Sequence, residues 1–321
     1  MPDVASDLAK DAVWPDLPYA AWRDTRATLH LWTQIVGKVR LKLTPWLNHS
    51  WHVTLYLTPQ GLGTGPMPAN GHDLAIDFDF IDHVLWLRLS DGRFRQVMLR
   101  PVPVAEFYLE VMAALGELGV AVRINEMPNE IAGAVRFSDD YAHAAYDPDF
   151  ANRHFRVLAA SQRVFAHFRT GFLGKASPVH FFWGSFDLAV TRFSGRNAPL
   201  FTSSSTPGLP LAVAREAYSH EVSSAGFWPG DETIGYPAYY SYAYPEPEGF
   251  AAAKVRPAAA FYFKEYNQFI LPYDAVHKAA DPEATLIEFL QSTYNAAADL
   301  GKWHRKALEC ALGKKGKVRA T

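Results

Sequence analysis

A nine-residue phrase occurs twice in this chain, and this repetition constrains the fold more than any other feature. The copies run from His30 to Lys38 and from His167 to Lys175, with His, Thr, Gly and Lys at the same places. Two further pairs of matched blocks follow in the same order, Gln96 to Leu99 with Gln268 to Leu271, and Val104 to Phe107 with Leu286 to Phe289. Matched blocks in a fixed order indicate an internal duplication. We therefore expect two copies of one structural unit.

The first copy reads as a helix, four strands and a second helix. Pro18 suits the first turn of a helix whose apolar residues recur at helical spacing, and Gly37 is predicted to end it. Short apolar or alternating runs predict strands at 51–58, 74–80, 84–89 and 94–100. A second apolar helical face begins at Val104 and ends at Gly119.

The second copy repeats this order. Asp147 and Pro148 predict the start of a helix that reaches Gly174, and Asp281 and Pro282 predict the start of another that reaches Gly301. Strands are expected between them at 180–193, 218–227, 239–244 and 259–271. The excess length of this copy falls mostly in segments 195–210 and 245–257, which are rich in turn-forming residues and read as loops.

These patterns predict an α+β fold made by tandem duplication of a helix–four antiparallel strands–helix unit, with the copies related by pseudo-two-fold symmetry. The expected divisions are a leader (1–17), a first unit (18–124), a second unit (147–301) and a terminal helix with a basic tail (302–321). Whether the two sheets merge or pack face to face stays open at this stage.

Composition excludes several classes of function. The formal net charge is −2, from 31 basic and 33 acidic side chains, so we expect no nucleic-acid partner. No apolar run approaches the roughly 18 residues of a membrane helix, so no membrane partner is expected. The first twenty residues carry charges such as Asp3 and Lys10 without an apolar stretch, and one cysteine, Cys310, expected in a late helix, suits a reducing compartment. We therefore expect a cytoplasmic protein.

The segment 180–193 is the densest candidate for a binding surface. As one strand it would place Trp183, Ser185 and Asp187 on one side, mixing rings with polar groups as a ligand-lining wall does. A solvated sheet face is the alternative. Alternation also places Asp187 and Arg192 on opposite faces, so no ion pair between them is expected.

A polar strand and two aromatic clusters supply the other candidates. His220 and Glu221 stand side by side in a segment that is polar for a strand, but neighbours in a strand face opposite ways, and a zinc site needs three or four converging ligands. A structural histidine with a satisfied hydrogen bond is the alternative to catalysis by His220. Trp228 and Tyr242 belong to aromatic clusters beside turns, which can stack on planar ligands or pack under loops. We expect no metal and no cofactor, because the usual motifs are missing.

The repeated His30/His167, Thr33/Thr170 and Lys38/Lys175 pairs are interpreted as structural, with each lysine just past a helix end. Gly174 and Lys175 follow a helix and lack the earlier glycine of a phosphate loop, so a nucleotide loop is rejected.

Five phrases resemble an uncharacterised bacterial family classed as a domain of unknown function. They are Trp14 to Tyr19, Ser177 to Leu188, Thr191 to Arg196, Tyr218 to Glu221 and Gly226 to Gly230. The resemblance extends from about Trp14 to Glu309. It implies a single bacterial protein and supplies no activity.

Two functions from different classes remain. The first is a cytosolic protein or enzyme with an aromatic-walled cleft in the second unit, which binds a small organic ligand. Its expected lining residues are Trp183, Ser185, Asp187, His220, Glu221, Trp228 and Tyr242. The alternative is a protein–protein interaction module with no catalytic activity. A saddle that grips DNA is disfavoured by the neutral charge. Catalysis, the identity of the ligand and the oligomeric state stay open.

Overall fold

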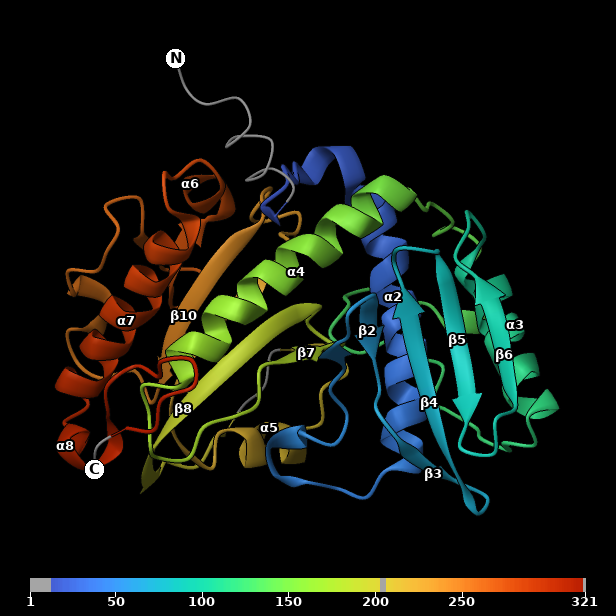
Figure 1. The fold of residues 1–321 in the computed structure, drawn as a ribbon, viewed down its shortest axis with the longest axis horizontal. Coiled ribbons are helices and arrows are strands. Elements are labelled where there is room, and N and C mark those ends of the chain that lie inside the picture. The colour runs from blue at the N-terminus through green and yellow to red at the C-terminus, as the bar shows by residue number, and fades with distance from the viewer. Residues whose placement is uncertain (1–12, 203–205, 320–321) are drawn as a thin grey trace.

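A computed structural model describes residues 13–202 and 206–319, so most of the expected leader and part of the 195–210 loop lie outside the described residues. Two antiparallel sheets of six strands each stand side by side (Figure 1). The strand orders are β1-β2-β4-β5-β6, with β3 on β4, and β11-β12-β10-β9-β8-β7. Helices beside antiparallel sheets confirm the α+β class, and the pseudo-two-fold symmetry stays a prediction.

The first half contains more strands than expected. Its elements are α2 (Tyr19–Leu43), β1 (Tyr56–Leu57), β2 (Gly61–Gly63), β3 (Met67–Ala69), β4 (His72–Asp79), β5 (Val84–Leu89), β6 (Phe94–Met98) and α3 (Val104–Glu117). Strands β4, β5 and β6 confirm three of the four predicted here, and β5 has the predicted bounds. The fourth, predicted at 51–58, contains only the two residues of β1. The two additional strands, β2 and β3, have three residues each and contain glycine or proline, so they are too short to show an alternating pattern.

The second half also has six strands in place of the predicted four. Its elements are α4 (Pro148–Arg169), β7 (His180–Phe182), β8 (Asp187–Asn197), α5 (Leu211–Ala217), β9 (His220–Trp228), β10 (Ala238–Tyr244), β11 (Phe261–Phe263), β12 (Gln268–Pro272), α6 (Tyr273–His277) and α7 (Pro282–Leu300). Two predicted strands, 180–193 and 259–271, are each a hairpin. Their turns contain Phe186 (φ 60°) and Asn267 (φ 51°) in the left-handed region, and phenylalanine is not a residue type that predicts a turn.

Helix ends agree with the sequence where a side chain caps them. The Asp147 carboxylate accepts the backbone N–H of Asp149 at 2.9 Å, and Asp281 accepts that of Ala284 at 2.9 Å. The prediction that Gly37 ends a helix is wrong, because α2 continues to Leu43. The prediction for Gly174 is also wrong, since α4 ends at Arg169.

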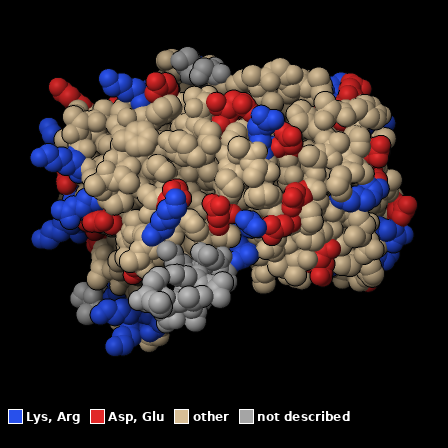
Figure 2. Space-filling view, turned by 90° about the horizontal axis from the view of Figure 1, so that it is seen from above, with Lys and Arg blue, Asp and Glu red and all other residues tan. Residues whose placement is uncertain are grey.

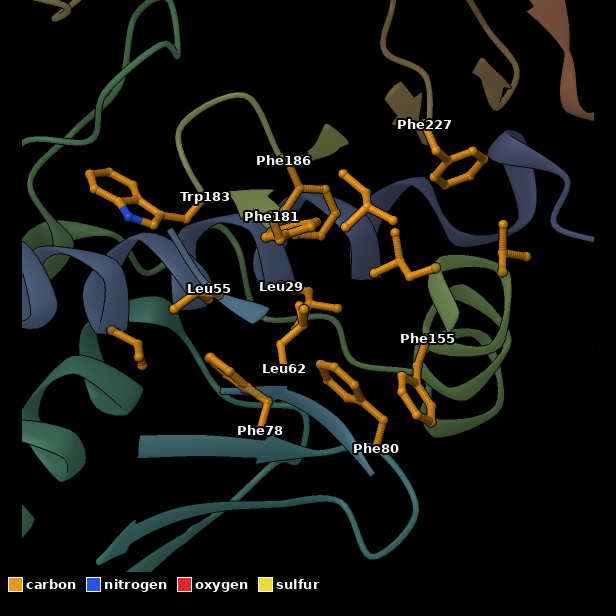
Figure 3. Packing of buried hydrophobic residues seen from close by; sticks show 14 of the residues in the cluster. Leu29, Leu55, Leu62, Phe78, Phe80, Phe155, Phe181, Trp183, Phe186 and Phe227 are labelled. Carbon is orange, nitrogen blue, oxygen red and sulfur yellow. The ribbon is translucent and has the colours of Figure 1, made fainter. Parts of the chain in front are cut away.

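The two sheets meet at one edge, which answers the question that the sequence left open. Leu55, just before β1, and Phe181 of β7 exchange two backbone hydrogen bonds of 2.9 and 2.8 Å. Apolar side chains from both sheets, α2 and α4 pack around this junction and form one continuous core (Figure 3). The labelled members from the first half are Leu29, Leu55, Leu62, Phe78 and Phe80, and those from the second are Phe155, Phe181, Trp183, Phe186 and Phe227.

The second sheet has two different faces. Helices α4 and α7 cover one face, where Phe165 of α4 packs against Tyr239 of β10 with ring centroids 6.2 Å apart (Figure 1). The opposite face carries the polar residues of the candidate site. None of the helices within the described ranges is both long and apolar enough to cross a membrane.

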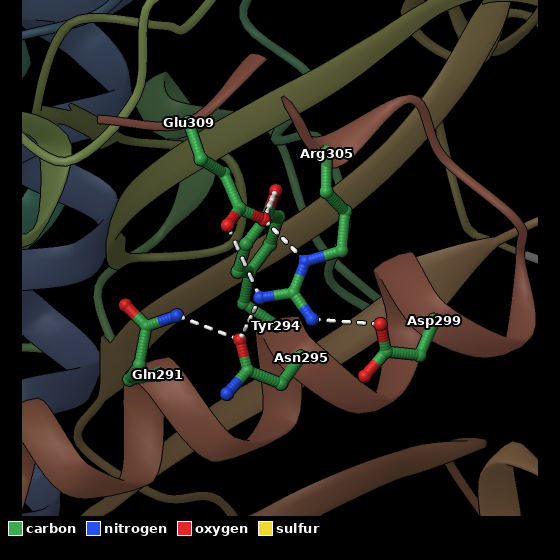
Figure 4. A network of polar contacts seen from close by, with 6 residues as sticks. All are labelled: Gln291, Tyr294, Asn295, Asp299, Arg305 and Glu309. Atoms are coloured by element: carbon green, nitrogen blue, oxygen red, sulfur yellow. Dashed lines mark hydrogen bonds and ion pairs between the residues drawn. The ribbon is translucent and has the colours of Figure 1, made fainter. Parts of the chain in front are cut away.

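The segment after α7 is fixed to that helix by a polar network (Figure 4). Arg305, at the start of α8 (Arg305–Leu308), donates to Glu309 at 2.6 Å and to Asp299 at 2.7 Å. The Tyr294 hydroxyl donates to the same Glu309 carboxylate at 2.8 Å. Cys310 lies beyond α8, so the expectation that it belongs to a late helix is wrong. The chain leaves the helix there, and the Cys310 N–H donates to the Gly171 carbonyl at 3.2 Å.

Candidate functional site

A cavity of about 1070 Å³ lies over the face of the second sheet that α4 and α7 leave free. Its floor is formed by β8, β9 and β10, and its walls by α2, α5, segment 46–53 and segment 123–130. Its volume is at the upper end of the range for small-molecule sites. The sequence placed the cleft in the second unit alone. The first half also contributes, with Lys38, Trp46, His49, Trp51 and Val53 among the lining residues.

Strand register brings the polar floor residues together. Ala189 of β8, Gly226 of β9 and Tyr240 of β10 stand in one cross-strand row. Because Gly226 has no side chain, the Tyr240 ring crosses over it, and a Cβ there would lie 2.5 Å from the Tyr240 hydroxyl oxygen. The Tyr240 hydroxyl therefore reaches the Asp187 carboxylate at the start of β8 and donates a hydrogen bond to Oδ2.

Asp187 is the most perturbed acid of the site. It is 6% exposed, and its second oxygen, Oδ1, has no hydrogen-bond partner among the described residues. Burial raises the pKa of Asp187 to about 7, opposed by the Tyr240 hydrogen bond and reinforced by the nearby Glu130 carboxyl. Burial likewise raises the pKa of Tyr240 well above its usual value, so Tyr240 remains the donor in this pair.

Glu130 brings a second carboxyl group to the same end of the cavity. The Ser185 hydroxyl donates to Glu130 at 2.7 Å, and Gly184 leaves room for the carboxylate, since a Cβ there would lie 2.2 Å from an oxygen of Glu130. Burial raises the pKa of Glu130 too. Glu130 has φ 62°, a strained conformation for a residue with a side chain. Its position is therefore held by specific contacts and not by backbone preference.

Helix α2 holds the segments that carry these acids. The Gln34 side chain accepts the N–H of Asn129 and donates to the Asn129 carbonyl, both at 2.8 Å. The His30 ring hydrogen-bonds to the Gly184 carbonyl at 2.8 Å. Burial lowers the pKa of His30 to about 3, so the ring is neutral near pH 7 and donates this bond. His30 is thus a structural residue, as the sequence interpretation proposed.

Aromatic rings form much of the wall. The Trp183 indole lies against Gly37 of α2, where a Cβ would be 2.3 Å from the ring, and its N–H donates to the Val53 carbonyl at 2.8 Å. This contact is the reason that α2 has a glycine in its middle. On the floor, the hydroxyls of Tyr218 and Tyr242 are 3.3 Å apart, so one donates to the other.

The repeated lysines have different environments. Lys38 is 4% exposed, lines the cavity and donates to the Asn129 side chain. Burial lowers its pKa to about 8. Lys175 donates to His49 Nε2 at 2.6 Å and lies 4.6 Å from the centre of the Phe193 ring. The expectation that both lysines follow a helix end is wrong for Lys38, because α2 extends beyond it.

Five of the seven predicted site residues line the cavity: Trp183, Ser185, Asp187, Trp228 and Tyr242. His220 and Glu221 do not. The His220 ring is paired with the Ser219 hydroxyl at 3.0 Å, and Glu221 forms an ion pair of 2.6 Å with Arg196. The two residues therefore have local partners at the beginning of β9.

Sequence reasoning missed Glu130, Lys38, His49 and Tyr240 as lining residues. Glu130 lies in the segment between the two units, for which no function was predicted. Lys38 was assigned to a helix end. Tyr240 belongs to the aromatic run that contains Tyr242, so its alternation with Tyr242 in a strand was a usable indication.

The site suits proton transfer or recognition of a charged group. A carboxyl with a pKa near 7 can donate or accept a proton at neutral pH. Among residues 13–202 and 206–319, no three His, Cys, Asp or Glu side chains converge on a metal-sized position. The surface in Figure 2 intersperses acidic and basic side chains among a majority of uncharged residues.

Comparison with known proteins places the chain in a family without giving it an activity. The model of one family, a family of unknown function (DUF5996), matches residues 14–310. Neither the curated proteins nor the solved structures contain a match. The matched region includes both sheets and every residue that lines the cavity. The chain belongs to this family of unknown function, DUF5996.

Proposed function

We propose that this protein binds a small organic ligand in the cavity between its two halves. The observation that carries the proposal is the buried Asp187 carboxyl, which belongs to a residue that lines the cavity and whose Oδ1 is unpartnered among the described residues. A buried polar group without a partner typically costs about 1–3 kcal/mol, and a bound ligand can supply the missing hydrogen bond.

Backbone strain around the cavity supports the same proposal. Three lining residues other than glycine, His49, Ser50 and Glu130, have positive φ, and Phe186 with φ 60° directly precedes Asp187. Such conformations cost about 1–3 kcal/mol each and persist where the surrounding contacts enforce them, often at ligand sites. The strained residues come from both halves of the chain.

We also propose that the chain arose by duplication, and that the two copies then diverged. Thr33 and Thr170 donate to the carbonyls of His30 and His167 at 2.8 and 2.6 Å, so this local bond of the repeated phrase is the same in both copies. His30 is buried, whereas His167 is exposed. Within this proposal the protein acts in the bacterial cytoplasm without a nucleic-acid partner, in line with its single cysteine and net charge of −2.

The test is a thermal-shift screen of a fragment library on the wild-type protein. A ligand at a hundredfold excess over its Kd stabilises the protein by about 2.7 kcal/mol. Val213→Trp should abolish the shifts, because Val213 of α5 lines the cavity and is partly exposed, so a larger ring can enter the space. The matched control is Ala212→Trp on the same helix, which is exposed and outside the lining.

Hits that survive Val213→Trp would show that binding occurs elsewhere. A library without any hit, together with a stable protein partner recovered at this face, would favour the interaction module.

A further inference from the structure

One end of the cavity carries two carboxyl groups, those of Asp187 and Glu130. The groups that influence the pKa of the Tyr218 and Tyr240 hydroxyls there are Asp187, Glu130 and Tyr242, and all of them become negative when they ionise. Desolvation raises the pKa of both carboxyls, Glu130 also raises the pKa of Asp187, and no basic side chain among the described residues contributes to either shift. Within residues 13–202 and 206–319, these acids therefore have no basic counter-ion.

The basic lining residues are not paired with these acids, although Asn129, which binds Lys38, directly precedes Glu130. The Lys38 ammonium is bound to the Asn129 side chain and is 5.8 Å from the centre of the Trp183 ring. Lys42 and Arg123, which also line the cavity, are exposed. None of the three forms an ion pair with Asp187 or Glu130 in the described part of the chain.

Building on the ligand-binding function above, we propose that the ligand is an organic ammonium ion, whose charged group pairs with the Asp187 carboxyl beside Glu130. The unpartnered oxygen is an acceptor, and an N–H donor on a cation makes a stronger hydrogen bond to it than a neutral hydroxyl does. A cation also replaces the missing counter-ion. An anionic group in the same place would meet two carboxyls that form no ion pair within the described residues.

The aromatic surroundings fit the same class of ligand. Tyr240 and Tyr242 are stacked with ring centroids 6.1 Å apart, and both line the cavity. The faces of such rings attract cations, more strongly when water is excluded. Trp183 and Trp228 line the same cavity and can cover the apolar part of the ligand.

The experiment compares three probes of one shape: 2-phenylethylamine, 2-phenylethanol and 3-phenylpropionate. Their Kd values are measured at pH 8 by calorimetry and by ligand-observed NMR, with the full-length protein. At this pH the amine is protonated and Asp187 is ionised. We expect the amine to bind at least tenfold more tightly than the alcohol, and the carboxylate to bind most weakly.

Two conservative variants assign the preference to the acids. Asp187→Asn removes the charge and keeps an acceptor for Tyr240, so it should reduce amine affinity tenfold or more and alcohol affinity by a clearly smaller factor. Glu130→Gln, at a position that is less buried, should act in the same direction with a smaller factor. Amine affinity of the wild-type protein should rise as pH increases from 5.5 to 8. The titratable groups facing Asp187 are Glu130, Tyr218, Tyr240 and Tyr242, and the tyrosines stay protonated over this range.

The outcomes separate the two proposals. If the alcohol or the carboxylate binds as tightly as the amine, and Val213→Trp blocks that binding, the cavity is a ligand site but the ammonium class is wrong. If Asp187→Asn does not fold, the ranking of the three probes on the wild-type protein still decides. If no probe binds and the library gives no hit, both proposals fail.

Discussion

Strand β8 buries two opposite charges on its two faces, and their surroundings differ. Arg192 faces α4 and α7, is 1% exposed, and has its guanidinium 3.5 Å from the centre of the Phe168 ring and 4.3 Å from that of Tyr294. It donates to the Phe168 carbonyl. Asp187 is 6% exposed and faces a cavity, with one oxygen free. The alternation that placed these residues on opposite faces of the strand is confirmed.

This comparison shows that burial of a charge does not by itself mark a functional site. The Phe168 and Tyr294 rings pack against the Arg192 guanidinium, Arg192 is not among the residues that line the cavity, and its pKa of about 10 keeps it charged at pH 7. Asp187 has partners on one side and about 1070 Å³ of space on the other. We therefore expect Arg192 to determine stability and Asp187 to determine ligand binding.

The largest effect should come from Arg192→Ala. Truncation removes the ring contacts and the bond to the Phe168 carbonyl, and it leaves a void in a packed core. By analogy with other large-to-small core changes we expect a loss of about 3–5 kcal/mol in the free energy of unfolding, measured by urea denaturation. Binding of 2-phenylethylamine should be unchanged at a temperature where the variant is folded.

Arg192→Lys is the control for this prediction. It keeps the charge and most of the volume but loses the planar stacking, so its cost should be clearly smaller than that of alanine. If Arg192→Ala weakened probe binding while remaining folded, the division of roles between the two faces would be wrong.

The next effect is the pH dependence that Asp187 gives to stability. Burial raises its pKa from the ordinary 3.8 to about 7, so the folded state holds the proton more tightly than the unfolded chain does. Stability of the wild-type protein relative to Asp187→Asn should therefore be greatest below the ordinary pKa. This relative stability should fall by up to about 4 kcal/mol as pH rises from 4 to 7, and it should then level off.

The measurement is the difference between wild-type and Asp187→Asn unfolding free energies at each pH. The difference is needed because buried histidines act in the opposite sense. Burial lowers the pKa of His30 and His154 to about 3, so those residues favour folding at higher pH. Their contribution is shared by both proteins. A difference that stays constant from pH 4 to 8 would refute the raised pKa of Asp187.

Gly37→Ala should have an intermediate effect. The new methyl group would lie 2.3 Å from the Trp183 indole, so this ring must leave its position on the cavity wall. We expect a cost of about 1–3 kcal/mol and weaker binding of 2-phenylethylamine. Gly116→Ala in α3 is the matched helical control, because its Cβ meets nothing within 4 Å, and it should stabilise by up to about 1 kcal/mol. Equal effects of the two substitutions would contradict the packing of Trp183 on α2.

The parts of the fold that could be predicted are those with local causes. Asp147 and Asp281 cap helices through bonds to residues two or three positions away, and β5 follows from its apolar run between turns. Gly37 shows the limit. Its role is set by Trp183, far away in sequence, so the usual meaning of a glycine near a helix end gave a wrong prediction. The turn before Asp187 was missed because Phe186 adopts a conformation that phenylalanine seldom takes.

The candidate site divides in the same way. Asp187 and Tyr242 could be found because they lie on the open face of regular strands, and within β8 the alternation holds. In β7 the predicted assignment of residues to the two faces is reversed. The turn at 183–186 puts Phe182 beside Asp187 on the cavity face. Glu130 and Lys38 could not be found, because their place depends on how α2 and segment 123–130 pack against the second sheet.

The smallest effect should come from Glu221→Gln, which tests a predicted site residue that lies outside the cavity. Glu221 forms an ion pair of 2.6 Å with Arg196, whose side chain is about half exposed (48%), and accepts from Ser194 at 2.8 Å. Pairs in such surroundings contribute about 0–1 kcal/mol, so urea denaturation should show a loss below about 1 kcal/mol. The Kd of 2-phenylethylamine should not change. If Glu221→Gln weakened binding of 2-phenylethylamine as much as Glu130→Gln does, the acidic end of the site would have to extend to the beginning of β9. The separation of the Asp187 site from the Glu221–Arg196 ion pair would then be wrong.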